Sequence, residues 1–382
     1  MRMVITQRYR PHTHQKGALL WLPSLPLAVR VWPARLAFMA WEADEMREVA
    51  SLSLAPAIPL DGFTAQVDLE QGSLLVWGGN QKGYLRCSVR CRPEGLLFSL
   101  ERFTLGERLH LSSEGALLAS TDGTALGTKL SLQKGETTLL SLAEASSAPL
   151  RSLVPSAERL FLGCSKGQLW SSIASRCAPT ELMALFHRAA QWLPPIDPLL
   201  ASGQATLLGQ YRESLEQKQV EKAALLLRQL LQGMVTPEAL LWLQPDHWSL
   251  LGYSNRLVGD GCGPVTSLQG LVSLFRKSLI QEEAGRVTLL PLLPASWPAG
   301  HFLDLSLQEG ALQLSFIWSK KRLRCAKLQA LKAVSISLEV EGSASQSCRL
   351  RRSLREKGER HSFPLALELE SDSICYLDRI ER

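Results

Sequence analysis

The stretch of sequence that decides the fold is residues 63–91, FTAQVDLEQGSLLVWGGNQKGYLRCSVRC. Apolar and polar residues alternate through its three parts, and turn-forming residues at Gln71–Gly72 and Gly79–Asn80 separate them. Such period-two alternation with short turns is typical of antiparallel strands that bury one face and expose the other. The stretch therefore predicts an antiparallel β-sheet.

Alternating segments continue after this stretch and return near the end of the chain. In the first part they are Leu96–Leu100, Arg108–Leu111, Lys129–Leu132 and Thr137–Leu142. In the last part they are Leu312–Trp318, Val334–Val340 and Leu365–Leu369. We therefore expect an N-terminal antiparallel, sandwich-like β domain over residues 1–150 and a smaller C-terminal β-sandwich over 285–382.

Between these two parts the period becomes helical. Thr180 is a predicted N-cap for a helix over Glu181–Trp192, and the stretch Ala205–Gln232 is helical except for a polar interruption at Glu216–Gln219. Further helices are predicted at Pro237–Leu243 and Thr266–Ile280. The fold class expected is thus α+β, with a short, reduced helical region over residues 151–284.

Composition indicates a folded chain of two or three domains of about 150 residues each. Hydrophobic residues make up 46% of the 382 residues and charged residues 20%, which excludes disorder. No run of about 18 uncharged apolar residues exists, so we expect a cytoplasmic protein with no membrane partner.

Metal or redox chemistry is not indicated by the cysteines and histidines. The eight cysteines form no C-x-x-C pair, and Cys87 and Cys91 share one face of a predicted strand, where we expect them in the core. His12 and His14 are the nearest approach to a metal pair and have no third ligand nearby. We expect neither a metal ion nor a cofactor.

Positive charge is concentrated in residues 320–360, where twelve Lys or Arg stand against four Glu, a local net of +8 within a total of +6. One hypothesis is therefore that the protein binds a polyanion or nucleic acid through residues 349–360 of this cluster. Lysine and arginine also protect sheet edges from aggregation, and aromatic residues for base stacking are missing directly after Trp318. Nucleic acid is therefore not the expected partner.

A second hypothesis concerns Gly163–Gly167, which matches the G-x-S-x-G pattern of serine hydrolases and would make Ser165 a nucleophile. Asp260 and His301 follow in the order that an esterase triad needs. The motif requires a surrounding series of parallel strands and helices, however, and the flanking pattern is one of hairpins.

A third candidate site is the glycine-rich turn Asn255–Pro264, which precedes the last predicted helix and carries Asp260. A carboxylate in such a turn, close to exposed backbone amides, could bind a ligand hydroxyl or a water, or could simply cap the helix. Aromatic residues beside a carboxylate are typical of sugar sites and also of hydrophobic cores. The candidate substrate-binding residues are Trp242, Asp246, His247, Trp248 and Asn255.

The segment 285–300, GRVTLLPLLPASWPAG, together with the helical run 266–275 before it, resembles the end of the catalytic domain of family-95 glycoside hydrolases, the α-L-fucosidase-like group. Residues 62–100 are similar to the β domain of the same family. The resemblance implies an N-terminal β domain, a helical catalytic domain and a C-terminal β domain. It places Asp260 where the family has the aspartate that helps to position the catalytic water.

Two features depart from the family pattern. Cys262 stands where the family has an asparagine, and about 130 residues replace the twelve-helix toroid that carries the general acid, so only one catalytic carboxylate can be named. We therefore expect a glycoside-hydrolase-like protein with a non-catalytic carbohydrate-binding or scaffold role and carbohydrate as its partner. The alternative is an active, fucosidase-like glycosidase in which Asp260 assists the water.

Overall fold

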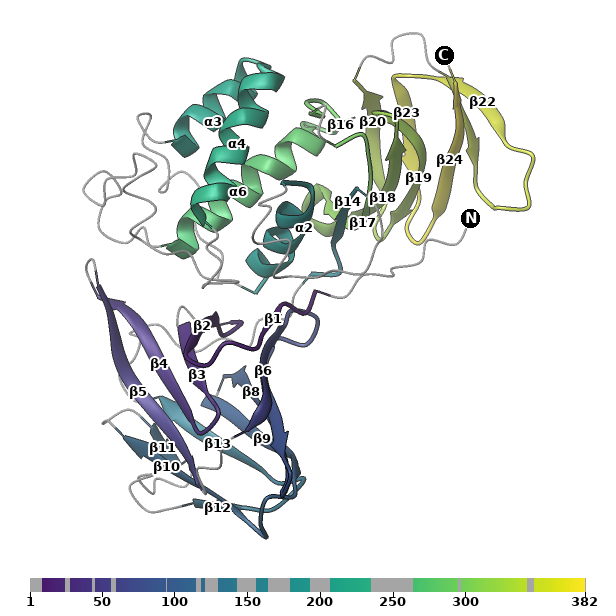
Figure 1. Cartoon of the computed structure of the whole chain (residues 1–382). Helices are drawn as coiled ribbons and strands as arrows, with labels where there is room; N and C mark the ends of the chain where they lie inside the picture. Colours follow the sequence, from purple (N-terminus) through teal and green to yellow (C-terminus); the bar gives the residue numbers. More distant parts are fainter. Residues whose placement is uncertain are drawn as a thin grey trace.

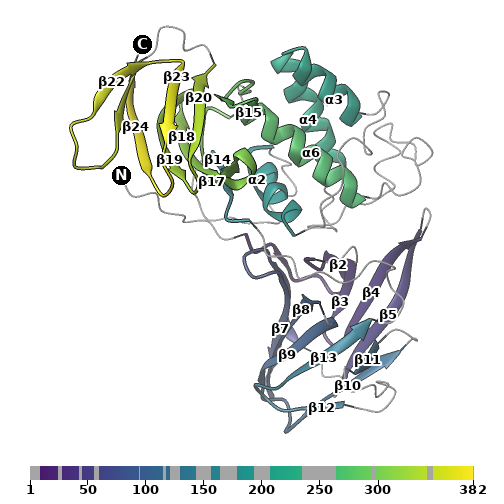
Figure 2. The same cartoon turned by 180° about the vertical axis from the view of Figure 1, so that it is seen from behind.

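The computed structural model describes residues 9–24, 28–42, 45–55, 60–93, 95–114, 118–120, 130–142, 156–163, 179–192, 207–234, 264–294, 297–341 and 347–381. These residues form an α+β protein in which strands dominate, so the expected fold class is confirmed. Figures 1 and 2 show the N-terminal strands as one body, with the helices and the C-terminal strands side by side beyond it.

The N-terminal body contains two antiparallel sheets that face each other. The seven-stranded sheet has the order β1-β6-β7-β8-β9-β13-β11 and the six-stranded sheet the order β12-β10-β5-β4-β3-β2. The strands are β1 (His12–Thr13), β2 (Ala18–Trp21), β3 (Ala28–Trp32), β4 (Arg35–Glu42), β5 (Glu45–Ala55), β6 (Asp61–Asp68), β7 (Ser73–Asn80), β8 (Gly83–Arg92), β9 (Gly95–Phe103), β10 (Leu109–Glu114), β11 (Leu118–Ser120), β12 (Leu130–Leu132) and β13 (Thr137–Leu142). Cys87 and Cys91 are buried on β8, as expected.

The described helices are α2 (Pro179–Ala190), α3 (Leu207–Glu216), α4 (Val220–Met234) and α6 (Pro264–Leu279). The polar interruption predicted at Glu216–Gln219 separates α3 from α4. There the Gln219 amide donates to the Ser214 carbonyl oxygen at 2.8 Å and the Lys218 amide to that of Leu215 at 3.1 Å. Lys218 is in the left-handed region at φ 57°. This pattern is a Schellman motif, which ends a helix sharply.

The C-terminal body is a sandwich of two further sheets, with the orders β14-β17-β18-β19-β24-β21-β22 and β15-β16-β20-β23. Its elements are β14 (Arg159–Leu162), β15 (Ile280–Glu283), β16 (Arg286–Leu289), β17 (Ala299–Leu307), η2 (Gln308–Gly310), β18 (Leu312–Ser319), β19 (Arg322–Ala330), β20 (Val334–Val340), β21 (Ser347–Arg351), β22 (Glu359–Ser362), β23 (Leu365–Leu369) and β24 (Ile374–Glu381). Residues 151–284, expected as the helical region, thus also give β14 and β15 to these sheets. The domain boundaries themselves stay predictions.

The segment 285–300 that carries the family resemblance packs into the core of this sandwich. Trp297 is 1% exposed, and its ring meets Phe275 of α6 edge-on at a centroid distance of 4.7 Å. The indole nitrogen of Trp318 on β18 donates to the Trp297 carbonyl oxygen at 3.1 Å. The described part of this segment therefore joins α6 to the sheet, which is a structural role.

Helix α2 connects both β bodies. The indole nitrogen of Trp192, just beyond its end, donates to the Leu69 carbonyl oxygen in the β6–β7 turn at 2.7 Å. The guanidinium of Arg188 donates to the same oxygen at 3.0 Å. Tyr9 adds a direct link, since its hydroxyl donates to the Leu160 carbonyl oxygen of β14 at 2.6 Å. These buried hydrogen bonds fix the N-terminal sandwich against the rest of the molecule.

Candidate functional site

The site residues proposed from the sequence lie outside the described residues. They are Trp242, Asp246, His247, Trp248, Asn255 and Asp260, all within the segment that joins α4 to α6. Their assignment stays a prediction, and so does the alternative in which Asp260 assists catalysis.

Ser165, the proposed esterase nucleophile, also lies outside the described residues and follows strand β14 in the sequence. The strand before it, β14, is antiparallel to β17 at the edge of its sheet. The ring of His301 on β17 lies 4.4 Å from that of Phe161 and is tilted to it by 39°, and burial lowers the pKa of His301. A nucleophile elbow instead follows a strand of a parallel sheet. The described surroundings therefore do not fit an esterase of that class.

Several charged side chains meet where α2, β14 and β17 come together. Glu158 accepts a hydrogen bond from the Ser306 amide at 3.1 Å and lies 3.5 Å from the Nε2 atom of His187 and 3.7 Å from Arg276. Burial alone would raise the pKa of Glu158, but the bond with His187 and the charge of Arg276 outweigh burial, and the pKa is lowered. This carboxylate stays ionised and holds the elements together.

Arg188 and Glu70 form a second cluster of charges at the same junction. Arg188 is 2% exposed and donates to the Leu69 and Ser156 carbonyl oxygens and to Gln191. Glu70 pairs with Arg159 at 3.1 Å and lies 3.5 Å from Arg188. Burial lowers the pKa of Arg188 to about 10, which still leaves it charged at neutral pH. Most of these groups bond to one another or to backbone oxygens, with Glu70 Oε1 buried and without a hydrogen-bond partner among the described residues, so we assign the junction a structural role.

A different arrangement occurs on the exposed face of the seven-stranded C-terminal sheet. A cavity of about 390 Å³ opens there, which we name the outer-face pocket. Its lining consists of Leu303, Asp304, Ser315, Cys325, Ala326, Lys327, Arg351, Leu354, Tyr376, Leu377 and Asp378. These residues come from β17, β18, β19, β24, β21 and the loop after β21, so the pocket spans five adjacent strands.

Strand register places a row of polar side chains across the pocket. Ser315 pairs with Lys327, Lys327 with Tyr376, and Tyr376 with Arg351. A bulge in β17 between Phe302 and Leu305 leaves Asp304 unpaired opposite Ser315, in the left-handed region at φ 52°. Hydroxyl, ammonium, phenol, guanidinium and carboxylate groups are thus held side by side by the sheet.

Hydrogen bonds within the protein hold this row. The Lys327 ammonium donates to the Gln329 side-chain oxygen and the Arg351 guanidinium to the Leu354 carbonyl oxygen, both at 2.9 Å. The Asp304 amide donates to the Ser315 hydroxyl oxygen at 2.9 Å, and that hydroxyl lies 3.4 Å from the Asp304 carboxylate. The Asp378 carboxylate accepts two hydrogen bonds from the Arg349 guanidinium, at 2.7 and 3.0 Å, and another from Arg351. The hydrogen bond from Arg349, together with the charge of Arg351, lowers the pKa of Asp378 despite partial burial. The two arginines therefore hold Asp378 as an anion.

Sequence reasoning missed this pocket because its residues are far apart along the chain. Lys327, Arg349 and Arg351 were assigned to a charged, strand-protecting cluster, and Tyr376 and Asp378 were not singled out. A signal was present, since Cys375 and Leu377 alternate with Tyr376 and Asp378, which puts the polar pair on the opposite face from the core. Only the strand order brings that face next to Lys327.

The remaining findings concern metals, membranes and known proteins. Within the described residues, no three His, Cys, Asp or Glu side chains gather closely enough to hold a metal ion. None of the described helices has the length and apolar character needed to cross a membrane. The sequence matches no protein-family model and no curated protein.

Proposed function

We propose that this protein binds carbohydrate through the outer-face pocket and does not cleave it. The observation that carries the proposal is the row Asp304, Ser315, Lys327, Tyr376 and Arg351, in which donors and acceptors surround one aromatic ring. Sugar hydroxyls both donate and accept, and the C–H face of a sugar packs on an aromatic ring. A cavity of about 390 Å³ is of the size that small ligands occupy.

The charge state of Asp378 favours binding over hydrolysis. A glycosidase of the usual kind needs a carboxylic acid that keeps its proton and a second carboxylate across the bond. Asp378 is held as an anion by Arg349 and Arg351, so it cannot act as the proton donor. An active glycosidase, with Asp260 assisting the water, is the alternative.

The architecture supports a relationship in form to family-95 glycoside hydrolases. Helices α2, α3, α4 and α6 stand between an N-terminal and a C-terminal sandwich, the order that the resemblance implies. Residues 163–279 lie between β14 and β15, and a stretch of this length is too short for the twelve helices of the family. We propose that the β parts kept a binding role.

We also propose a cytoplasmic location. The five described cysteines are unpaired. Free thiols in such positions fit a reducing compartment. Detection of the tagged full chain in fractionated cells tests this proposal, and recovery from a secreted fraction would contradict it.

Calorimetric titration of the full chain with 2′-fucosyllactose, lactose and maltose tests the binding proposal. We expect at least one sugar to bind saturably, and Tyr376→Ala to weaken that binding roughly tenfold, equivalent to about 1.4 kcal/mol. Tyr84→Ala is the matched control, because Tyr84 is a half-buried tyrosine beside an arginine on the N-terminal sandwich. It should leave the affinity unchanged.

Two outcomes would replace the proposal by its alternatives. Release of nitrophenol from 4-nitrophenyl α-L-fucoside, abolished by Asp260→Asn, would make the protein a glycosidase. Absence of binding to all three sugars, with tight heparin binding that weakens steeply with salt, would make it a polyanion-binding protein.

A further inference from the structure

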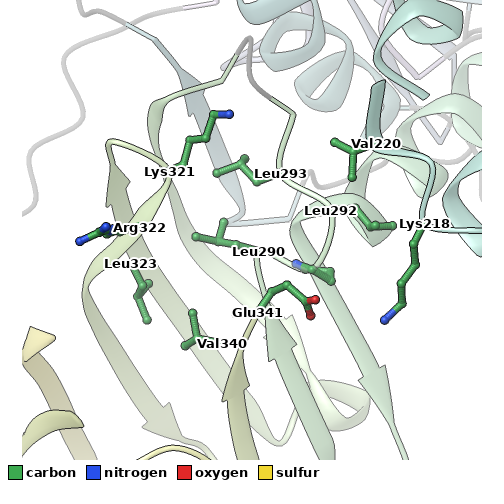
Figure 3. Close-up of a pocket in the computed structure, with 11 residues that line it drawn as sticks. Lys218, Val220, Leu290, Leu292, Leu293, Lys321, Arg322, Leu323, Val340 and Glu341 are labelled. Carbon is green, nitrogen blue, oxygen red and sulfur yellow. The ribbon is translucent and has the colours of Figure 1, made fainter. Parts of the chain in front are cut away.

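A second cavity lies between the helices and the C-terminal sandwich, away from the outer-face pocket. Figure 3 shows it, and we name it the hairpin pocket; its volume is about 350 Å³. Three parts of the chain that are distant in sequence meet there. They are the α3–α4 turn, the segment Leu290–Leu293, and the β18–β19 hairpin, with the end of β20 completing the lining.

The wall of the hairpin pocket is apolar. Leu290, Leu292 and Leu323 contribute to it and are themselves almost fully buried, while Val220 and Leu293 are partly buried beside them. Figure 3 shows these side chains grouped between the charged residues. An apolar body placed against this wall would lose contact with water, which is favourable.

The exposed charged residues of the hairpin pocket are mostly positive. Lys218, Lys321 and Arg322 stand against the single carboxylate of Glu341, a net of +2 at the cavity. Among the hydrogen bonds and ion pairs found between described residues, none involves the ammonium or guanidinium group of these three cations. They come from two different elements, so their charges are available to a third group.

The backbone at two of these cations is unfavourable for lysine. Lys218 holds the left-handed C-terminal position of the Schellman motif at φ 57°, where glycine is the usual residue. Lys320 and Lys321 form the two-residue loop between paired Ser319 and Arg322, at φ 54° and 59°. Such a loop prefers asparagine and glycine. Lysine thus stands at left-handed positions where glycine or asparagine would be more stable, at Lys320 as well as at the two pocket lysines.

We propose that the hairpin pocket binds a small organic anion, a carboxylate or phosphate attached to an apolar body. The acidic group is attracted by the charges of Lys218 and Lys321, which stand on opposite sides of the apolar wall in Figure 3. The apolar body lies on Leu290, Leu292 and Leu323. This inference is independent of carbohydrate binding, because the two cavities share no residue.

Titration of the full chain with 1-naphthoate, 1-naphthyl phosphate and the uncharged 1-naphthamide tests the proposal. At low salt we expect a saturable site for at least one of the two anions and an affinity for the amide roughly tenfold lower, about 1.4 kcal/mol. The relative affinity of the carboxylate and the phosphate identifies which head group the site prefers.

Glycine and asparagine variants separate the charge of the lysines from their structural role. Lys218→Gly and Lys321→Asn should raise the melting temperature or leave it unchanged, because they relieve the left-handed strain, and should each weaken anion binding about fivefold. Lys320→Asn is the matched control, since it removes a lysine from the same loop but from outside the pocket lining. It should leave the affinity unchanged.

Three results would overturn the proposal. The first is equal binding of anion and amide, and the second is an effect of Lys320→Asn as large as that of Lys321→Asn. The third is absence of saturable anion binding to the folded chain at millimolar concentrations.

Discussion

Replacing Gly72 by alanine tests how the N-terminal sandwich is attached to α2. Gly72 ends the turn between β6 and β7 at φ 65°, and its amide donates to the Asp68 carbonyl oxygen at 2.8 Å. An alanine Cβ at this position would lie 2.9 Å from the Cε3 atom of Trp192 and closer still to Cζ3 and Cη2. Carbon atoms that are not bonded do not approach so closely, so one of the two residues must move.

The indole of Trp192 has little freedom to move away. Its ring nitrogen is bonded to the Leu69 carbonyl oxygen at 2.7 Å, and the side chain is 6% exposed. Left-handed backbone costs alanine about 1–2 kcal/mol. Losing the indole hydrogen bond costs about 1 kcal/mol, and partial loss of tryptophan packing adds about 1–2 kcal/mol, less than the about 3–5 kcal/mol of a full Trp→Ala change. We therefore expect Gly72→Ala to lower the free energy of unfolding by about 3–5 kcal/mol.

Urea unfolding followed by tryptophan fluorescence measures this change, and Gly62→Ala provides the matched control. Gly62 has nearly the same φ, 62°, but nothing lies within 4 Å of an added Cβ. Its substitution should cost only the backbone strain, about 1–2 kcal/mol. In a Trp192→Ala background, the loss of unfolding free energy caused by Gly72→Ala should fall to that caused by Gly62→Ala in the native background. Equal effects of the two glycine substitutions in the native background would refute the packing of Trp192 on this turn.

Three further predictions concern buried charges and thiols. Arg188→Met should lower the free energy of unfolding by about 3 kcal/mol, measured by urea unfolding, because buried acceptors lose their donor. An unchanged free energy of unfolding would contradict the stabilising role of Arg188 at the junction. The pKa of Glu158 is lower in the folded chain than its unfolded value of about 4.3. Stability should therefore fall as the pH drops below about 5, and Glu158→Gln should flatten that dependence in acid unfolding curves. Iodoacetamide at pH 7.5, read by peptide mass spectrometry, should spare the thiols whose pKa burial raises until the chain is unfolded; these are Cys87, Cys91, Cys325, Cys348 and Cys375.

Local patterns predicted much of the secondary structure. The strands expected within 63–91 are β6, β7 and β8, and the break expected at Glu216–Gln219 is the turn between α3 and α4. In both cases neighbouring residues determine the structure, through alternation in the strands and through a run of polar residues that interrupts the apolar stripe. The last helix was expected to include Ile280, which instead begins β15.

Long-range pairing was not accessible from the sequence. Strand β14 precedes the helices in the sequence, yet its residues pair with β17, which follows them more than a hundred positions later. The parallel pairing of β16 with β20 is likewise set by packing rather than by any local pattern. Strands β2 to β5, within residues 18–55, were also not predicted individually. Periodicity identifies a strand, but not its partner.

The candidate site shows the same limit. The residues expected to carry function lie in one continuous stretch, 242–260, because sequence reading favours motifs that are local. The outer-face pocket has no such motif, since Asp304, Lys327, Arg351 and Tyr376 become neighbours only through strand order and register. A site of this kind can be found only once the sheet is known.

The fold also changes the meaning of the basic segment 320–360. Read along the chain, it is one block of positive charge of the kind that binds a polyanion. In the structure four of its twelve cations line the two pockets: Lys321 and Arg322 the hairpin pocket, and Lys327 and Arg351 the outer-face pocket, where Arg351 is partly neutralised by Asp378. Residues 349–360 stay together on the β21–β22 hairpin, where Arg349 pairs with Arg360 across the two strands. A polyanion needs many cations along one surface, whereas a small ligand needs a few beside a cavity. The four cations at the pockets fit the small-ligand proposals, and the polyanion hypothesis for residues 349–360 stays a prediction.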